Sequence, residues 1–389
     1  MTYWINFLHL YQPPYQTADI INQVVKESYW VLIDLLKKNP QAKMTMNISG
    51  SLIEHLLATK NEKLILEFKK LVEKKQIELT ASACYHPILP LLPETEIIRQ
   101  IRLNDALLKK VFGRVFRPTG FYLPEMAYSF KVAKILKKLG FSWIILDEIC
   151  YNGKMGQVNW RKKYRIKGLN IEVVFRNRKI SKSFVPQTVL QEASRTKPPL
   201  FIVTATDGEM YGHHHKDKGG IELFRNALKD PLIKTKTVGQ YLKMLPKKSQ
   251  GIEPVAASWE SSEGDILDHN PYSLWKDPKN KIHQMLWELR KLAIRIINQN
   301  VGKPNYDWAR HHLDRGLASC AWWWASEKRP DAFAPITWNP DTIEKGIKEL
   351  ITSIRSLPNV NPKIKLQAEK IYRQLLKRVW SHHWKKYAK

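Results

Sequence analysis

Short apolar runs of strand length recur along the first two thirds of the chain, and amphipathic helical patterns separate them. This alternation predicts βα units and a parallel sheet. No G-x-G-x-x-G turn follows any of the runs, so a closed barrel is favoured over an open dinucleotide-binding sheet. The predicted strands are residues 3–9, 44–48, 77–81, 117–122, 142–146, 171–175, 200–206 and 254–258.

The strand pattern stops near residue 270, and helical patterns rich in Leu, Ile and Trp follow. We therefore expect an α/β protein with a closed barrel over residues 1–270 and an α-helical subdomain over residues 271–389. A polar, irregular stretch near residues 150–178 predicts a small insertion at one end of the barrel. The length of 389 residues allows such a division, because domains average about 150 residues.

Composition excludes several other classes of protein. With 43% hydrophobic and 11% aromatic residues, a compact core is expected rather than disorder or a coiled coil. No apolar run approaches the roughly 20 residues that a membrane span needs. The first residues are typical of a strand rather than a leader, and Cys84, Cys150 and Cys320 form no C-x-x-C pair. We expect a cytoplasmic protein without a disulfide bond.

The formal net charge is +28, which favours anionic partners in general. Lysines nevertheless recur through nearly every predicted helix, as solvated helix faces do, so no nucleic-acid partner is expected. Basic and aromatic residues cluster only in the last helix, residues 363–389. This helix is expected either to dock electrostatically on an acidic partner or membrane surface, or to pack internally. The packing residues would be Leu366, Ile371, Leu375, Leu376 and Val379.

Two carboxylates follow predicted strands at the end of the barrel where active sites form. Glu125 comes after Tyr122 and Pro124 in a tight turn, and Asp207 comes directly after the apolar run 200–205. Carboxylates from two strand ends, facing a pocket with aromatic walls, are what glycoside cleavage requires. A surface acid at 125 and a helix N-cap at 207 are the structural alternatives.

Other residues near the strand ends are candidates for binding a sugar. The aromatic rings of Tyr122, Trp259 and Trp275 offer flat apolar faces to sugar rings. Gln12 and Glu209 are expected to bind sugar hydroxyls. These five residues extend the predicted site beyond the two carboxylates.

The run His213-His214-His215 lies close to Asp207 in the sequence and resembles a set of zinc ligands. No two histidines stand four apart, so the usual helical zinc pair is absent, and we assign no metal and no cofactor. His213 is expected to hydrogen-bond a sugar or Asp207. A metal-dependent carbohydrate deacetylase and a non-catalytic binder of anionic polymers remain alternatives. The absence of P-loop and G-x-S-x-G motifs excludes NTPase and serine hydrolase functions.

Five segments resemble, in order, the signature regions of glycoside hydrolase family 57. The segments are 9–13 (HLYQP), 76–87, 120–127 (GFYLPEMA), 205–213 (ATDGEMYGH) and 259–275. The resemblance implies a distorted, TIM-like (β/α)7 barrel with Glu125 as nucleophile and Asp207 as general acid/base. It also implies that His9, Glu78 and Trp259 contact the sugar next to the cleaved bond. Tyr11 and Tyr122 depart from the histidine and tryptophan that many members carry there.

The same resemblance implies a retaining enzyme that acts on α-glucans by double displacement. Its two carboxyl groups would lie about 5–5.5 Å apart. We expect an α-amylase-like hydrolase of α-1,4 linkages, because the long β-rich extension of the family's glucanotransferases is absent. A 4-α-glucanotransferase or a branching-type transglycosylase would use the same intermediate and is the main alternative.

Overall fold

The computed structural model describes residues 1–214, 218–328 and 336–387. The chain forms two compact units. The first comprises residues 1–12, 16–84 and 89–266, and the second comprises residues 13–15, 85–88 and 267–389. The domain boundary near residue 270 and the insertion near 150–178 remain predictions.

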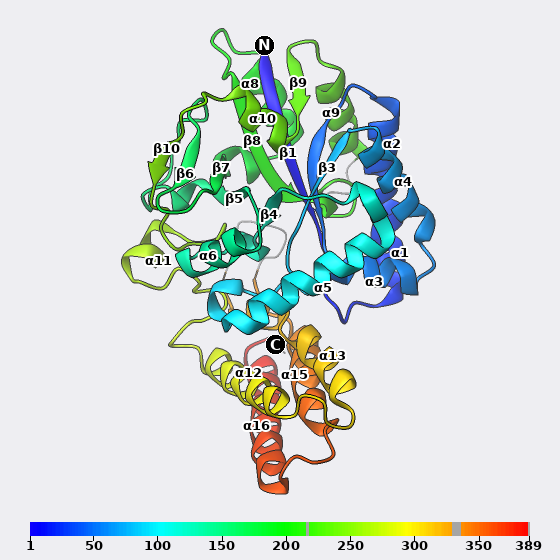
Figure 1. Ribbon diagram of the computed structural model, residues 1–389, viewed down its shortest axis with the longest axis vertical. Helices are drawn as coiled ribbons and strands as arrows, with labels where there is room; N and C mark the ends of the chain where they lie inside the picture. The colour runs from blue at the N-terminus through cyan, green and yellow to red at the C-terminus, as the bar shows by residue number, and fades with distance from the viewer. Residues whose placement is uncertain (215–217, 329–335, 388–389) are drawn as a thin grey trace. The chain divides into compact units, whose positions relative to one another are not determined.

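Seven strands build the barrel of the first unit (Figure 1). They are β1 (Thr2–Leu10), β2 (Met44–Ile48), β3 (Ile77–Thr80), β4 (Gly120–Tyr122), β5 (Trp143–Asp147), β7 (Glu172–Arg176) and β8 (Phe201–Asp207). One parallel sheet has the order β3-β2-β1-β8, and the other contains β7-β5-β4. The two sheets join at two places. Ala81, which follows β3, forms a parallel bridge with Phe121 of β4, and Asn177, which follows β7, donates its N–H to Val203 O of β8 over 2.8 Å. The predicted closed barrel is thus confirmed.

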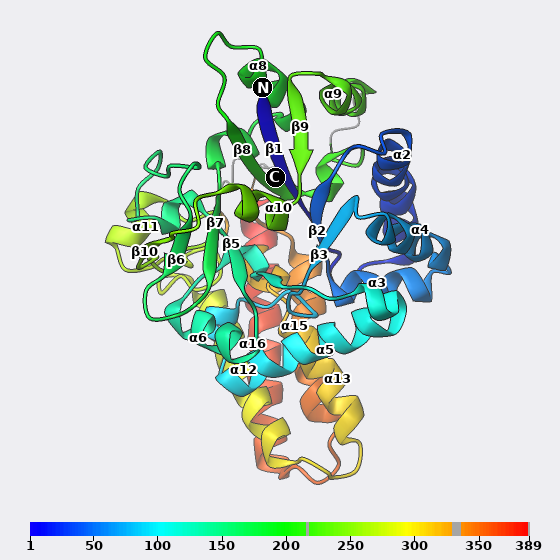
Figure 2. The same cartoon turned by 45° about the horizontal axis from the view of Figure 1, so that its top comes forward.

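Strand β1 is the central strand of its sheet and is buried along most of its length. On one side it pairs with β8 from Tyr3 to His9. On the other side its first half pairs with β9 (Ile233–Lys236) and its second half with β2 (Figure 2). Because side chains alternate along a strand, Phe7 faces the barrel interior while Leu8 packs in the core outside it. His9 therefore faces the interior as well.

One predicted strand is wrong. Residues 254–258 contribute only an isolated bridge between Ala257 and Tyr128. The structure instead contains three short strands that the sequence patterns did not predict: β6 (Tyr164–Ile166), β9 and β10 (Gln250–Ile252). These strands have three or four residues and carry exposed polar side chains, so they lack the apolar signal of a buried strand.

Most helices of the first unit bury one apolar face. In α4 (Glu62–Glu73), for example, Leu64, Phe68 and Leu71 are buried at helical spacing. The others are α1 (Ala18–Val24), α2 (Trp30–Lys38), α3 (Gly50–Ala58), α5 (Glu94–Phe112), α6 (Phe130–Lys138), α7 (Arg178–Ser181), α8 (Val185–Ala193), α9 (Lys218–Lys229) and α10 (Val238–Met244). Helix α11 (Glu263–Leu267) ends where the chain passes to the second unit.

Helix α10 packs inside the barrel rather than around it. Val238 and Tyr241 belong to the same buried cluster as Ile5 and Phe7 of β1. Because α10 directly follows β9, which pairs with the first residues of β1, it occupies the barrel interior towards the start of β1. Polar side chains occupy the barrel interior near the opposite ends of the strands.

The second unit is helical, as expected. Its helices are α12 (Lys281–Gln299), α13 (Tyr306–Gly316), α14 (Cys320–Trp323), α15 (Pro340–Arg355) and α16 (Pro362–Lys386). In α16 the expected packing residues Ile371, Leu375 and Val379 are buried. Leu366 is 68% exposed, so its predicted packing role is wrong: the buried face of α16 begins at Ala368.

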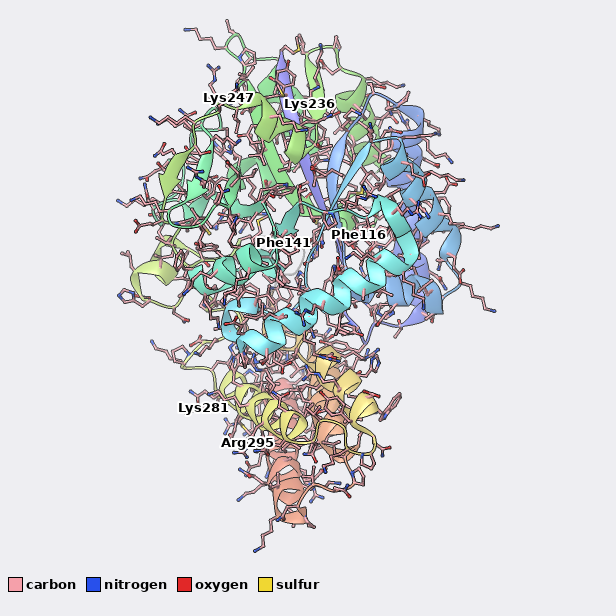
Figure 3. The ribbon with its side chains drawn as sticks, in the orientation of Figure 1. Phe116, Phe141, Lys236, Lys247, Lys281 and Arg295 are labelled. Carbon is pink, nitrogen blue, oxygen red and sulfur yellow. The ribbon has the colours of Figure 1, made fainter. Side chains whose placement is uncertain are left out.

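Basic side chains are distributed over both units rather than gathered on one. Lys236 and Lys247 belong to the first unit, and Lys281 and Arg295 lie on α12 (Figure 3). Electrostatic docking through α16 remains a prediction. Over residues 1–214, 218–328 and 336–387, the structure contains no helix with the length and hydropathy of a membrane span.

Candidate active site

The ends of β1, β4 and β8 bring three polar side chains together. The β1–β8 register sets His9 beside Asp207. The His9 ring stacks on the Tyr122 ring with centroids 4.4 Å apart, and its Nδ1 donates to Asn47 Oδ1 over 2.8 Å. Burial lowers the pKa of His9 to about 3. The imidazole is therefore neutral near pH 7 and can hydrogen-bond a ligand without carrying charge.

Glu125 follows β4 in a tight turn with an unusual backbone. Its φ of 57° and ψ of 17° lie in the left-handed region, which costs an L-residue about 1–2 kcal/mol. Trp259 holds this turn from two directions. Its indole Nε1 donates to Glu125 Oε2 over 2.8 Å, and its backbone N–H donates to Glu125 O over 3.1 Å. Such strain is typical of functional sites whose surroundings hold it in place.

Trp259 is itself held by a buried arginine. The Arg176 guanidinium lies 5.0 Å from the Trp259 ring centroid, and its Nη2 donates to Trp259 O over 3.2 Å. The cation faces the negative side of the ring system, which favours this arrangement. The Trp259 ring also meets His9 and Tyr122 edge to face, at 6.4 and 6.3 Å between centroids. Trp259 thus contacts Glu125, Arg176, His9 and Tyr122.

A buried ion-pair network fixes Arg176 at the end of β7. Its Nε donates to Asp147 Oδ2 over 2.6 Å, and Arg178 Nη2 lies 2.6 Å from Asp147 Oδ1. The Asp147 side chain is fully buried, so it needs both partners. Sequence reasoning did not select Arg176 or Asp147, although their positions at the ends of two predicted strands were the available signal.

Asp207 ends β8 and is partly buried. Burial raises its pKa well above the usual range, and the negative charges of Glu209 and Glu125 raise it further. The positive charge of Arg176 opposes this shift. Asp207 therefore keeps its proton to a higher pH than an ordinary aspartate, which a general acid requires.

Glu209 lies two residues beyond Asp207 and is 3% exposed. Its Oε1 accepts from the Tyr11 backbone N–H over 3.2 Å, from Gln12 Nε2 over 3.5 Å and from the Tyr29 hydroxyl. Burial outweighs these donors and raises the pKa of Glu209 to about 7. Tyr29 was not predicted, because nothing in its local sequence indicates a contact with a residue 180 positions later.

The structure brings seven of the predicted site residues together: His9, Gln12, Tyr122, Glu125, Asp207, Glu209 and Trp259. Glu78 also points into the barrel, but its Oε2 accepts from the Thr45 hydroxyl and the Gly239 N–H, both over 2.9 Å. The bond from Gly239 connects Glu78 to the start of α10, and the bond from Thr45 connects it to β2. Its sugar-binding role remains a prediction.

Two further predicted residues have other surroundings. His213 Nδ1 lies 2.6 Å from Glu27 Oε2, so its protein partner is Glu27 rather than Asp207. Trp275 belongs to the second unit, where its carbonyl accepts from Trp287 Nε1 over 2.8 Å. Their roles in binding sugar remain predictions. His215 lies outside the described residues, and within the described part of the chain no group of three or more His, Cys, Asp or Glu could hold a metal ion.

A family model for glycosyl hydrolase family 57 matches residues 7–252, which is well over half of the chain. The chain belongs to glycosyl hydrolase family 57. The matched span contains the barrel strands, apart from the first five residues of β1, and includes Glu125 and Asp207. The resemblance to this family is thereby confirmed, and the segment 259–275 lies outside the matched span.

Family 57 relatives of several activities are similar to this chain. The α-amylase of Pyrococcus horikoshii is 26% identical over 281 residues, which cover 67% of this chain and 44% of that protein. The chain thus spans less than half the length of that curated relative. The crystal structure of 4-α-glucanotransferase from Thermococcus litoralis has a TM-score of 0.71 at 18% identity, covering 92% of this chain and 60% of that one.

A second solved structure matches over nearly its whole length. The family 57 branching enzyme of Thermococcus kodakaraensis has a TM-score of 0.69 at 14% identity and covers 96% of this chain and 95% of that one. At these identities the two structural matches show the shared fold. The distorted (β/α)7 barrel with a C-terminal helical region is thus confirmed.

Proposed function

We propose that this protein is a retaining α-glucan-active enzyme, an α-amylase-like hydrolase of α-1,4 linkages. Glu125 is the nucleophile and Asp207 the general acid/base. The observation that carries the proposal is the pairing of a conformationally strained Glu125, fixed by Trp259, with an Asp207 whose pKa is raised. Two carboxyl groups with different protonation states are what the double-displacement mechanism needs.

In the first step a Glu125 carboxylate oxygen attacks the anomeric carbon from the face opposite the leaving group. The bond from that carbon to the glycosidic oxygen breaks, and Asp207 gives its proton to this oxygen. The first product leaves with a free hydroxyl, and the remaining glycosyl unit is bonded to Glu125. Asp207 is now a carboxylate.

In the second step the Asp207 carboxylate takes a proton from a water molecule, whose oxygen attacks the anomeric carbon. The bond to Glu125 breaks, Glu125 is again a carboxylate, and the second product has the original α configuration. His9 is neutral and stacked on Tyr122, so it suits hydrogen bonding to a sugar hydroxyl without opposing charge in either step.

The first experiment incubates the wild type, Glu125→Gln and Asp207→Asn with maltoheptaose and separates the products by chromatography. We expect shorter products from the wild type and a loss of at least about 10³-fold in both variants. The matched controls are Glu253→Gln and Asp105→Asn, which alter surface carboxylates paired with lysines. Cleavage by Glu125→Gln at the wild-type rate would overturn the nucleophile assignment.

A second experiment separates the two roles. With an α-glucosyl fluoride substrate and azide, Asp207→Ala should form an α-glucosyl azide. In this variant azide attacks the Glu125-bound intermediate from the face of the sugar opposite Glu125. Glu125→Ala should form the β-azide, because azide then attacks the substrate directly. The reverse stereochemistry would exchange the assigned roles.

The alternative is transfer, in which an acceptor sugar hydroxyl replaces water in the second step. Support comes from the relatives, since a 4-α-glucanotransferase and a branching enzyme have the same fold. Products longer than maltoheptaose in the chromatogram would indicate transfer. Products that are only shorter would indicate hydrolysis.

A further inference from the structure

A π-helical turn, Val25–Tyr29, interrupts the helix formed by α1 and α2. Its last three residues each bond to the loop that follows β8. The bonds join Glu27 to His213 Nδ1 (2.6 Å), the Ser28 hydroxyl to Gly208 O (2.9 Å), and the Tyr29 hydroxyl to Glu209 Oε1. This loop directly follows Asp207, the proposed acid/base.

Three consecutive residues of an α-helix cannot all face one neighbour, because successive side chains are about 100° apart. A π-helical turn is wider and accommodates an additional residue, so consecutive side chains diverge less. Such turns are rare and often occur at functional sites. In this protein the turn lets Glu27, Ser28 and Tyr29 reach the same loop.

A glycine on the loop side shows how closely the two segments approach. Gly212 has a φ of +100°, and a Cβ at this position would lie 2.1 Å from the Glu27 carbonyl oxygen. No other residue type fits there without displacing the backbone of the turn. The loop is therefore in direct backbone contact with the π-helical turn, independently of the three side-chain bonds.

Several groups set the charge state of Glu209. Tyr29 donates from the π-helical turn, and Tyr11 N–H and Gln12 donate from the segment after β1. The bond from Tyr29 lowers the pKa of Glu209 against the effect of burial. The pKa of Tyr29 is raised by burial and by the Glu209 charge, so the phenol stays protonated and keeps donating.

Asp207 in turn faces charged groups from several elements. Glu209 and Glu125 favour its protonated form, as does Glu260 from the segment after β10, whereas Arg176 from β7 opposes it. His9 is neutral and adds no charge. Glu209 is therefore the charged neighbour whose own protonation depends on the π-helical turn.

We propose that the π-helical turn Val25–Tyr29 is a positioning element for the acid/base loop: Tyr29 stabilises the Glu209 carboxylate, and the charge of Glu209 holds the proton on Asp207. Tyr29 is a positioning residue, since it acts through Glu209 rather than on the substrate. The inference rests on the role of Asp207 in the proposed function.

The first test measures the Tyr29–Glu209 coupling without any substrate. The infrared band of protonated buried carboxyl groups is titrated in the wild type and in Tyr29→Phe, and the Glu209 component is assigned by its loss in Glu209→Gln. We expect a wild-type midpoint near pH 7 that rises by about one unit in Tyr29→Phe, the scale of one hydrogen bond lost from a carboxylate. An unchanged midpoint would overturn the proposal.

The second test measures kcat/KM for maltoheptaose against pH. In Tyr29→Phe more Glu209 is protonated at a given pH, so Asp207 releases its proton earlier. The basic limb should move to lower pH by about half to one unit. Glu209→Gln should move it in the same direction, and adding Tyr29→Phe to Glu209→Gln should give no further shift, because both act through one group.

The matched control is Tyr241→Phe, which removes a buried hydroxyl that donates to Trp160 O over 2.6 Å. This variant should unfold at a lower temperature and keep the wild-type pH profile. Coincident profiles for the wild type, Tyr29→Phe and Glu209→Gln would overturn the inference. An infrared shift in Tyr29→Phe, together with a wild type that leaves glucans intact, would support the Tyr29–Glu209 coupling and overturn the proposed function.

Discussion

Trp259 donates two hydrogen bonds to Glu125. Its indole Nε1 lies 2.8 Å from the side-chain Oε2, and its backbone nitrogen lies 3.1 Å from the carbonyl oxygen. The two residues are 134 positions apart and come from different segments of the barrel rim. The orientation of the proposed nucleophile is therefore set by a residue outside its own strand and turn.

Replacing Trp259 with phenylalanine should lower kcat about 10- to 100-fold, because the carboxylate loses one charge-assisted hydrogen bond. KM for maltoheptaose should change much less, since the apolar ring remains. Trp160→Phe is the control, because its Nε1 donates to the Phe175 carbonyl rather than to a carboxylate. A wild-type kcat in Trp259→Phe would contradict the role given to this bond.

Asp147→Asn should lower the free energy of unfolding by about 3–5 kcal/mol, because it leaves the buried charge of Arg176 without its anionic partner. Urea unfolding followed by tryptophan fluorescence measures the change. Glu253→Gln breaks the exposed pair with Lys167 and should leave the midpoint almost unchanged. Equal midpoints for both variants would show that the network around Asp147 adds no net stability.

Gly212→Ala should cost activity as well as stability. Its φ is +100° and its new Cβ would meet Glu27 O, so the acid/base loop must move. Gly156→Ala is a matched control, because its φ is +72° and a Cβ there meets nothing within 4 Å. Both variants should unfold at a lower temperature from backbone strain, whereas only Gly212→Ala should lose kcat, about 10-fold or more. Full activity in Gly212→Ala would contradict the close packing of the loop against Glu27.

The depressed pKa of His9 predicts a specific acid sensitivity. Its folded-state pKa of about 3 lies below the ordinary 6.5, so its stabilising contribution is complete above pH 6.5 and is lost as pH falls towards 3. The unfolding temperature of His9→Gln should therefore fall less than that of the wild type between pH 7 and pH 4. His283, whose pKa is also lowered, is present in both proteins and cancels in the comparison. Parallel curves would argue against a neutral His9.

The barrel and the core of the site were predictable because both depend on local patterns. Buried parallel strands are continuous apolar runs, and residues just after them must meet at one rim, which is why Glu125 and Asp207 could be selected. His9 was selected from the family resemblance. Strand β9 was not predictable, since its sequence Ile-Lys-Thr-Lys alternates with charges. The contact between Tyr29 and Glu209 depends on how a helix packs against a distant loop, and no periodicity in the sequence reports that.

Strand β1 has a consequence for biosynthesis. It is made before these partners and is buried almost throughout, yet Tyr3 pairs with Phe201 and Thr2 with Ile233. At about 5–20 residues per second, the ribosome delivers these partners about 10–50 s later. Until then this apolar strand of nine residues has an unpaired edge, which favours aggregation. Barrel closure is therefore a late step in the synthesis of this chain, and we expect that shielding residues 2–10 raises the yield of folded protein.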